Sequence, residues 1–257
     1  MLMTYIAAGF AVGLLVGMTG VGGGSLMTPL LTLLFGVSPT VAVGTDLAFA
    51  SITKSAGTVT HRFNRTVNWA IVRRLCLGAL PAALVATLLL SRYGTVQAEI
   101  GQLIRYSIAV SVMLTVVALL FRRRMVAWVN AQPGRQLQGR ALHLATIGAG
   151  ALLGTLVTIS SIGAGAVGAT LLVLLYPKLT PAEVAGTDIA YAVPLTAIAA
   201  FGHWWLGSID WMLLLTLLIG SLPGITLGSM LARKVPERFL RALLALTLTG
   251  VAFKLVY

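Results

Sequence analysis

The tripeptide Gly-Thr-Asp occurs twice in this sequence, and each copy places a carboxylate inside a long apolar segment. The first copy ends at Asp46 and the second at Asp188, 142 residues further along. A charged group at the centre of a lipid-embedded helix costs at least ~2.5–3.5 kcal/mol, so it requires a partner, a water-filled cavity or a function. Two interpretations stay open. The carboxyls take part in proton or cation coupling, or they are protonated structural groups beside Thr45 and Thr187.

Glycine-containing breaks precede two unusually short apolar segments. Glycine allows an unwound backbone, and a helix that starts after such a break presents free N–H groups and the positive end of its dipole. Such a site favours an anion, with serine hydroxyls as further donors. Close packing of small residues is the alternative, but two breaks at matched positions favour a binding site. The candidate substrate-binding residues are Gly22, Gly23, Gly24, Ser25, Thr45, Ser160, Ser161, Gly163, Gly165 and Thr187.

Three further ionisable side chains are candidates for a charge or gating role. Lys54 follows Asp46 by eight residues, on roughly the same face of a helix. It could offer a positive charge to an anion, although its position near a helix end favours snorkelling of the ammonium to the membrane surface. His61 and His203 end equivalent segments. We expect both at the membrane interface, with gating or protonation as the alternative.

No pattern in the sequence resembles an enzyme site. We find no zinc-ligand spacing, nucleophile elbow or Walker-type phosphate loop. The single cysteine, Cys76, lies in an apolar segment and is interpreted as a small packing residue. We therefore expect no enzyme activity, no cofactor and no metal site.

The elements that carry these residues must have lipid as their main solvent. Of 257 residues, 58% are hydrophobic and only 9% are charged, whereas soluble domains carry roughly a quarter charged residues. The net charge of +12 comes mostly from short basic clusters between apolar runs. This placement is typical of membrane topology signals and favours basic membrane loops over a nucleic-acid site, so we expect no nucleic-acid partner. The expected partners are a lipid bilayer and a small anionic substrate, and the oligomeric state is left open.

The apolar runs predict an all-α integral membrane protein of about ten spans, with short broken helices at the glycine-rich breaks. Eight of the expected helices are long enough to cross a hydrocarbon core of roughly 30 Å. If the two short ones also cross, fourteen of the eighteen lysines and arginines fall on one side, as the positive-inside rule requires. Both termini are then periplasmic. The expected helices cover residues 4–20, 24–36, 39–60, 69–91, 103–121, 141–160, 164–176, 181–203, 211–232 and 238–256.

A shift of 142 residues superimposes the two halves of the sequence. Besides the Gly-Thr-Asp motifs, it aligns Ser38-Pro39 with Thr180-Pro181 and Asn68-Trp69 with Asp210-Trp211. Five spans in each half require the halves to be inverted, and the distribution of basic residues agrees with this. We predict a first repeat over 1–121, a cytoplasmic basic linker over 122–140 and a second repeat over 141–257.

These motifs resemble those of the sulfite exporter TauE/SafE family. The first half contains G-V-G-G-G-S-L and S-P-x-x-A-x-G-T-D-L-A, and the second contains H-x-x-x-G-x-x-D-W and G-S-L-P-G-I-x-L-G-S. The resemblance covers essentially the whole chain and implies a bacterial inner-membrane permease for sulfur-containing or carboxylate-type organic anions. The family more often has serine where Asp46 and Asp188 stand here, and the second glycine run is reduced. The resemblance therefore supports an anion transporter more strongly than it supports sulfite.

The leading hypothesis is a secondary transporter that exports a small anion, sulfite or a sulfonate, by alternating access. The anion would rest between the two glycine breaks, and Asp46 and Asp188 would carry protons near the gates on their own sides. Proton binding would assist anion binding, because an ionised carboxylate repels the substrate. Two alternatives are kept: a cation or metal transporter that uses Asp46 and Asp188 as ligands, and a membrane scaffold that transports nothing.

Overall fold

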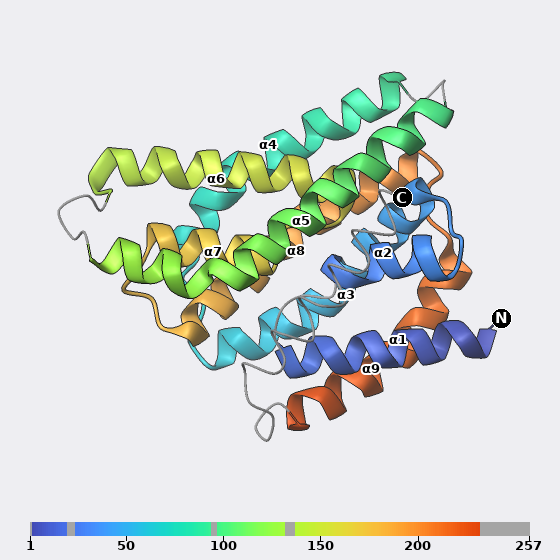
Figure 1. Ribbon diagram of the computed structural model, residues 1–257, viewed down its shortest axis with the longest axis horizontal. Coiled ribbons are helices and arrows are strands. Elements are labelled where there is room, and N and C mark those ends of the chain that lie inside the picture. Colours follow the sequence, from blue (N-terminus) through green and yellow to red (C-terminus); the bar gives the residue numbers. More distant parts are fainter. Residues whose placement is uncertain (1, 20–23, 94–96, 132–136, 232–257) are drawn as a thin grey trace.

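The computed structural model describes residues 2–19, 24–93, 97–131 and 137–231, and within these ranges the regular structure is entirely helical. Figure 1 shows long helices that lie roughly alongside one another, with the short α2 and α7 among them. The described helices are α1 (Leu2–Thr19), α2 (Gly24–Leu34), α3 (Pro39–Phe63), α4 (Trp69–Tyr93), α5 (Gln97–Asn130), α6 (Gly139–Ser160), α7 (Ala166–Leu175), α8 (Pro181–Trp205) and α9 (Trp211–Leu231).

Each described helix corresponds to a segment predicted from the sequence, whereas the segment 238–256 lies outside the described residues. Helix α5 departs most from its expected bounds, since it continues to Asn130 instead of ending at residue 121. Residues 122–130 contain arginine, methionine and alanine, which favour helix, and the first strong helix breaker is Pro133. The expected helix end at residue 121 is therefore wrong, and α5 extends through the first nine residues of the basic segment 122–140.

The start of α8 is set by its own sequence and coincides with the start of the expected helix 181–203. The Thr180 hydroxyl accepts a 3.3 Å hydrogen bond from the Glu183 N–H, and the Glu183 carboxylate accepts a 2.8 Å bond from the Thr180 N–H. This reciprocal capping box is followed by Pro181 as the first helical residue. Helix α3 likewise begins at Pro39. The two Gly-Thr-Asp motifs consequently lie about two turns inside their helices.

Two tightly packed helix pairs, α1 with α9 and α4 with α6, flank the bundle (Figure 1). Small residues allow the close approach. A Cβ added to Gly13 of α1 would lie 2.7 Å from the Cα of Ser221 in α9, and one added to Gly154 of α6 would lie 2.8 Å from the Cα of Ala79 in α4. Small residues at helix contacts let backbones pack closely where hydrophobic collapse gives no driving force, as in lipid.

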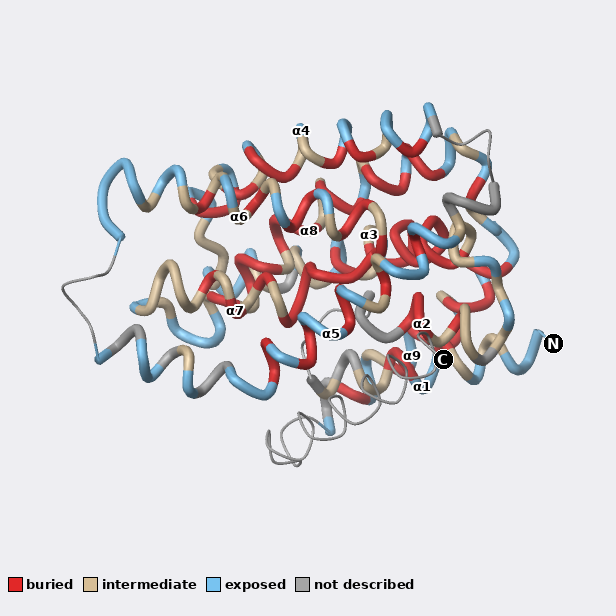
Figure 2. Tube along the Cα trace, turned by 45° about the horizontal axis from the view of Figure 1, so that its top comes forward, coloured by how far each residue is buried: buried red, intermediate tan, exposed pale blue. Residues whose placement is uncertain are grey.

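Helices α3 and α8 form the centre of the fold. They pack on each other, and both carry long buried stretches in Figure 2, where residues 42–50 of α3 are all buried. Outer helices keep large apolar side chains on their exposed faces, for example Leu88 in α4 and Leu144 in α6. An apolar exterior around a packed interior suits a protein that is solvated by lipid.

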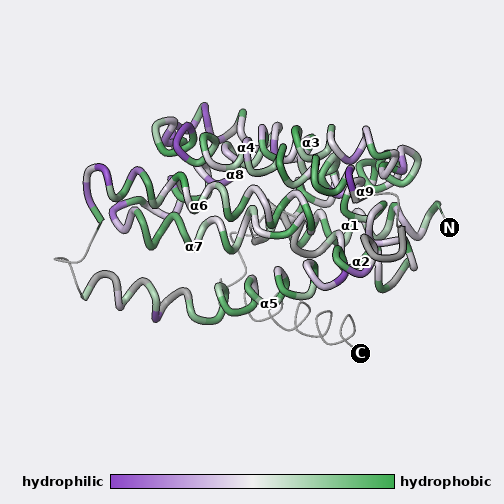
Figure 3. The backbone as a smooth tube through the Cα atoms, turned by 90° about the horizontal axis from the view of Figure 1, so that it is seen from above, coloured by the Kyte–Doolittle hydropathy of each residue, from purple (hydrophilic) through white to green (hydrophobic). Residues whose placement is uncertain are grey.

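Among the described residues, five helices are long and apolar enough to cross a membrane. These are segments of α4, α5, α6, α8 and α9, and α7 and part of α1 are shorter apolar helices. Figure 3 shows long hydrophobic stretches along the helices, with hydrophilic residues gathered toward the ends of the bundle. The chain is therefore a multi-pass helical membrane protein.

Candidate functional site

The second glycine-containing break connects α6 to α7 in the interior of the fold. Helix α6 ends at Ser160, and Ser161 then adopts a left-handed conformation with φ of 58°. Gly163 and Gly165 have φ of 133° and 141°, values that side chains with a Cβ rarely adopt. Residues 160–166 are all buried, so the break lies within packed protein. The sequence correctly predicted a non-helical backbone here, between a long and a short helix.

The first break lies largely outside the described residues. Gly22 and Gly23 fall in the range 20–23, which the structure does not describe. Gly24 is the first residue of α2, and Ser25 follows it in the helix. The predicted pairing of the two breaks around one anion therefore stays a prediction.

The two serines at the second break have different surroundings. Ser160 Oγ lies 2.7 Å from Leu156 O and 2.9 Å from Ser111 Oγ of α5, so its single O–H has two acceptors within reach, and it accepts a bond from the Ile162 N–H at 3.2 Å. The Ser160 hydroxyl thus stabilises the C-terminal end of α6. Ser161 Oγ is buried near the Asp46 carboxylate but completes no hydrogen bond with the described residues. Ser161 is therefore the serine of the second break that lies beside Asp46.

Asp46 is completely buried where α3 meets α2 and the second break. The Thr28 hydroxyl of α2 donates a 2.6 Å hydrogen bond to Asp46 Oδ2, while Oδ1 has no partner among the described residues. Sequence reasoning missed Thr28. The repeat could have drawn attention to it, since the shift of 142 residues aligns Thr28 with Thr170 of α7, which is also buried.

Asp188 is also buried, and it lies between α8 and α7. A Cβ added to Gly168 of α7 would collide with Asp188 Oδ1 and would lie 2.9 Å from Tyr191 Oη. Tyr191 is a fully buried residue one turn further along α8, and it too was absent from the sequence-based candidates. The absence of a side chain at Gly168 thus makes the space that the Asp188 carboxylate and the Tyr191 hydroxyl occupy.

Lys54 points into this core and does not snorkel, so the favoured expectation from the sequence was wrong. Its side chain is only 6% exposed, and Nζ donates a 3.2 Å hydrogen bond to Ala164 O in the second break. The ammonium also lies within electrostatic range of both Asp46 and Asp188. A carbonyl dipole and two carboxylates compensate the charge inside the protein, which removes the need to reach the membrane surface.

Thr45 and Thr187 each connect a central helix to a loop of the other half of the chain. Thr45 Oγ1 accepts a 3.1 Å hydrogen bond from the Asp210 N–H, and Thr187 Oγ1 accepts a 3.0 Å bond from the Asn68 N–H. The two bonds are equivalent under the 142-residue shift. In this conformation both hydroxyls hold helix–loop contacts, and we call these two contacts the seams.

The two histidines do not share an environment. His203 is 1% exposed, and its Nε2 lies 2.9 Å from Thr158 O of α6, so it is enclosed by protein near the end of α8. Its expected position at the membrane interface stays a prediction. His61 is half-buried at the end of α3, with Nδ1 2.8 Å from Thr66 Oγ1. His203 packs against the helix that leads into the second break, whereas His61 belongs to the end of the bundle.

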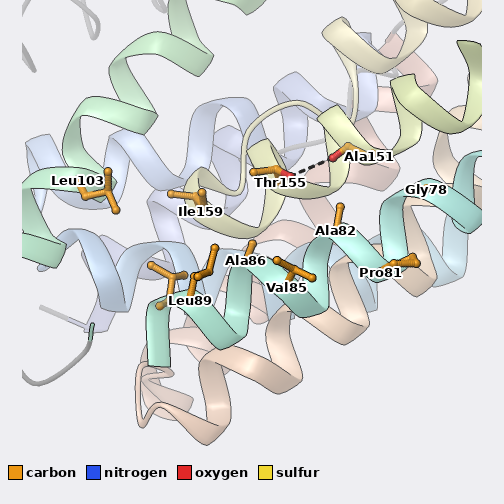
Figure 4. Close-up of a pocket in the computed structure, with 11 residues that line it drawn as sticks. Gly78, Pro81, Ala82, Val85, Ala86, Leu89, Leu103, Ala151, Thr155 and Ile159 are labelled. Atoms are coloured by element: carbon orange, nitrogen blue, oxygen red, sulfur yellow. Dashed lines mark hydrogen bonds between the residues drawn. The ribbon is translucent and has the colours of Figure 1, made fainter. Parts of the chain in front are cut away.

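One described groove, of about 550 Å³, lies between α4, α5 and α6, and Figure 4 shows its lining. Leu89, Val85, Leu103 and Ile159 dominate its walls, and the Thr155 hydroxyl is bonded to Ala151 O within α6. This lining provides no charge or free donor for an anion. The groove therefore does not belong to the candidate site.

Lys54, Asp46 and Asp188 lie together beside a broken helix, in the interior of a multi-pass helical fold. Charged groups buried within membrane helices are expensive and mark ion or substrate pathways, and interrupted helices frame the binding sites of many transporters. Fold and site thus define a membrane transporter.

Comparison with known proteins agrees with this class. The family described as "Sulfite exporter TauE/SafE" matches residues 5–255. Over the full length of both chains, the sequence is 36% identical to "Probable membrane transporter protein YjnA" of Bacillus subtilis (strain 168). It is 28% identical to "Probable membrane transporter protein YdhB" of the same organism, over 95% of this chain and 96% of that protein. No solved structure matches. The chain belongs to the sulfite exporter TauE/SafE family of membrane transporters.

Proposed function

We propose that this protein moves a small sulfur-containing anion, such as sulfite or an organosulfonate, across the bacterial inner membrane by proton-coupled alternating access. The observation that carries the proposal is the position of Lys54, a buried cation that reaches the second break between two buried carboxylates. A positive charge beside an unwound backbone attracts an anion. The family name supports a sulfur oxyanion as the first substrate to test.

The charge balance of the core supports proton coupling. With all three groups ionised, Asp46, Asp188 and Lys54 carry one net negative charge, which repels an anion. Protonation of both carboxyls leaves the ammonium uncompensated, and one bound monovalent anion then neutralises it. Protons and anion therefore bind more favourably together than separately. Gradients of both species decide the direction of net movement.

An inverted-repeat architecture accounts for the reciprocal contacts. Helix α1 packs on α9 and α6 packs on α4, so the first helix of each half pairs with the fourth helix of the other. The seams show the same reciprocal pattern, since Thr45 and Thr187 each bond to a loop of the other half. We propose a first repeat over 1–121 and a second over 141–257, joined on the cytoplasmic side by the basic segment 122–140, whose first part extends α5. Both termini are then periplasmic.

The seams provide a physical basis for alternating access. In an inverted pair, the contact at Thr45 closes one side of the central site and the contact at Thr187 closes the other. Each depends on one backbone N–H donor, whose net contribution is about 0.5–1.5 kcal/mol. Bonds of this size can be exchanged for water during each transport cycle, so the two sides can open in turn.

A cation transporter is the alternative, with Asp46 and Asp188 as ligands. The Thr28 hydroxyl and the second-break carbonyls would supply further oxygens, as hard cations require. Lys54 disfavours this alternative, because its ammonium already donates a hydrogen bond to the Ala164 carbonyl and would repel a second cation. A membrane scaffold that transports nothing would not require Asp46, Asp188 and Lys54 to be buried.

Flux into proteoliposomes tests the proposal directly. Purified protein is reconstituted, and uptake of radiolabelled sulfite, a short alkanesulfonate and a divalent cation is compared at several pH gradients. We expect anion uptake that is stimulated by protons moving in the same direction. Asp46→Asn and Asp188→Asn should flatten the pH profile, whereas Asp210→Asn, which keeps the side-chain oxygen that caps α9 through the Leu213 N–H, should not. Cation uptake without anion uptake would refute the proposal.

A further inference from the structure

A second cavity, also of about 550 Å³, lies at the end of the bundle where α4 begins. Its walls come from the start of α4, the residues before and within the first turn of α6, and the connection between α7 and α8. In contrast to the groove of Figure 4, it presents polar and basic groups, among them Asn68, Arg74, Gln138 and Lys178. We call this cavity the vestibule.

Arg74 is held in the vestibule wall by a chain of hydrogen bonds. Its guanidinium donates a 3.3 Å bond to Tyr176 Oη, and this hydroxyl lies 2.8 Å from Thr146 Oγ1 of α6. A guanidinium has five N–H donors in a fixed plane, so the Tyr176 contact orients it and leaves donors for an oxyanion. A residue that served only as a topology signal would need charge alone and no such support.

The charge of the vestibule favours an anion. Arg74 and Lys178 are cationic, and Glu183 is the carboxylate in its wall. The Glu183 Oε2 atom already accepts bonds of 2.8 Å from both the Thr180 N–H and the Thr180 hydroxyl, where it caps α8. Its negative charge is therefore engaged by the helix terminus, while Lys178 stays exposed to solvent.

The vestibule adjoins the candidate transport site. Asn68 contributes to its wall, and the Asn68 N–H forms the seam with Thr187. The next residue in α8 is Asp188, which lies within electrostatic range of Lys54. The Asn68–Thr187 seam thus joins the vestibule wall to the helix that carries Asp188.

The two ends of the molecule differ at the corresponding positions. The 142-residue shift aligns Arg74 with Thr216 and Lys178 with Gly36, so both basic positions of the vestibule have uncharged equivalents. Asp210 replaces Asn68. Duplication of the two halves therefore does not account for the basic residues of the vestibule.

We infer that the vestibule is a capture site for small oxyanions, in which Arg74 and Lys178 bind the substrate before the Asn68–Thr187 seam opens. This inference rests on the proposed function and adds a second, outer site to it. Basic clefts raise the local concentration and the association rate of anions, and this effect falls as ionic strength rises. The vestibule speeds exchange with its own side of the membrane, whereas the direction of net transport still depends on the gradients.

Arg73 provides a matched control, because it neighbours Arg74, carries the same charge and is exposed outside the vestibule lining. We would compare Arg74→Gln, Lys178→Gln and Arg73→Gln with the unmodified protein in two measurements. The first is equilibrium binding of radiolabelled sulfite to protein in detergent. The second is the KM for sulfite that enters from the vestibule side, at low and at high salt.

We expect Arg74→Gln and Lys178→Gln to weaken sulfite binding and raise KM by roughly 10-fold, which is the lower end of electrostatic effects on association. Their KM should also lose most of its dependence on salt, which a merely structural defect would not cause. Arg73→Gln should behave as the unmodified protein. Equal effects of Arg73→Gln and Arg74→Gln, or no effect of either, would overturn the inference.

Three further outcomes distinguish anion capture from lipid binding and from the transport function itself. If the Arg74→Gln defect disappears in bilayers without anionic lipid, the vestibule holds a phospholipid headgroup and the inference fails. If the unmodified protein binds sulfite through Arg74 yet moves none across the bilayer, the capture site stands and the proposed transport function fails. If sulfite crosses the bilayer equally well with both vestibule substitutions, the transport function stands and the capture site fails.

Discussion

Lys54 Nζ donates a 3.2 Å hydrogen bond to the carbonyl oxygen of Ala164, a residue 110 positions further along the chain. The bond links α3, which belongs to the first half of the sequence, with the break that precedes α7 in the second half. An ammonium can donate three hydrogen bonds, and the Ala164 carbonyl accepts one of them. The remaining stabilisation comes from the nearby charges of Asp46 and Asp188. A ligand that binds Lys54 must therefore compete with groups from both halves.

Replacement of Lys54 tests whether its charge serves transport. Lys54→Met should abolish most sulfite flux, because two buried carboxylates then lack a cation and an anion has no counter-charge. Breaking a buried charge cluster costs about 3–5 kcal/mol, so a loss of thermal stability is also expected. The double variant Lys54→Met/Asp188→Asn should recover stability but not flux. Recovery of both in the double variant would show that Lys54 has only a structural role.

The hydrogen bond from Thr28 to Asp46 should set part of the pH profile of transport. Thr28→Val removes the donor that stabilises the ionised carboxylate at 2.6 Å, so protonation of Asp46 becomes easier. Hydrogen bonds to charged groups contribute about 1.5–3 kcal/mol, which corresponds to a shift of the half-maximal pH by about one to two units toward alkaline values. Thr28→Ser keeps the donor and is the control. A profile that does not move in Thr28→Val removes Asp46 from proton coupling.

Glycine should be required at position 168, because a side chain there would occupy the space of the Asp188 carboxylate. Gly168→Ala introduces a Cβ that collides with Asp188 Oδ1, and overpacking of this kind costs about 1–3 kcal/mol. We expect a lower melting temperature and strongly reduced flux. Gly148→Ala is the matched control, since a Cβ at this helical position meets nothing within 4 Å. Equal stability and flux in both variants would mean that α7 moves away from Asp188 at no cost.

The sequence predicted the elements of this fold well because hydrophobic length and helix-starting residues are local signals. The Thr-Pro pair at 180–181 shows this, since its capping box needs only four consecutive residues. The unwound backbone at Gly163 and Gly165 was likewise encoded by glycine itself. By contrast, the sequence did not predict that Lys54 and His203 are buried, because their positions near helix ends say nothing about the partners that they meet inside the protein.

The polar partners of the site could not be predicted from spacing alone. Thr28 reaches Asp46 from another helix, and Tyr191 reaches the Asp188 region only because Gly168 leaves room. Single threonines and tyrosines in apolar segments are common and carry no distinctive pattern. Comparison of the two halves gives the one usable signal, since Thr28 and Thr170 occupy equivalent positions.

Thiol labelling tests the proposed inversion of the two halves. Asn64 and Leu206 are equivalent under the 142-residue shift and lie in the turns that follow α3 and α8. An odd number of spans between them puts the two turns on opposite sides of the membrane. In a Cys76→Ala background, Asn64→Cys should react with a membrane-impermeant maleimide only from the cytoplasmic side, and Leu206→Cys only from the periplasmic side. Both cysteines should react after detergent solubilisation, which controls for local accessibility. Labelling of both positions from the same side of intact membranes would exclude five spans in each half, and with them the reciprocal gating by the Thr45 and Thr187 seams.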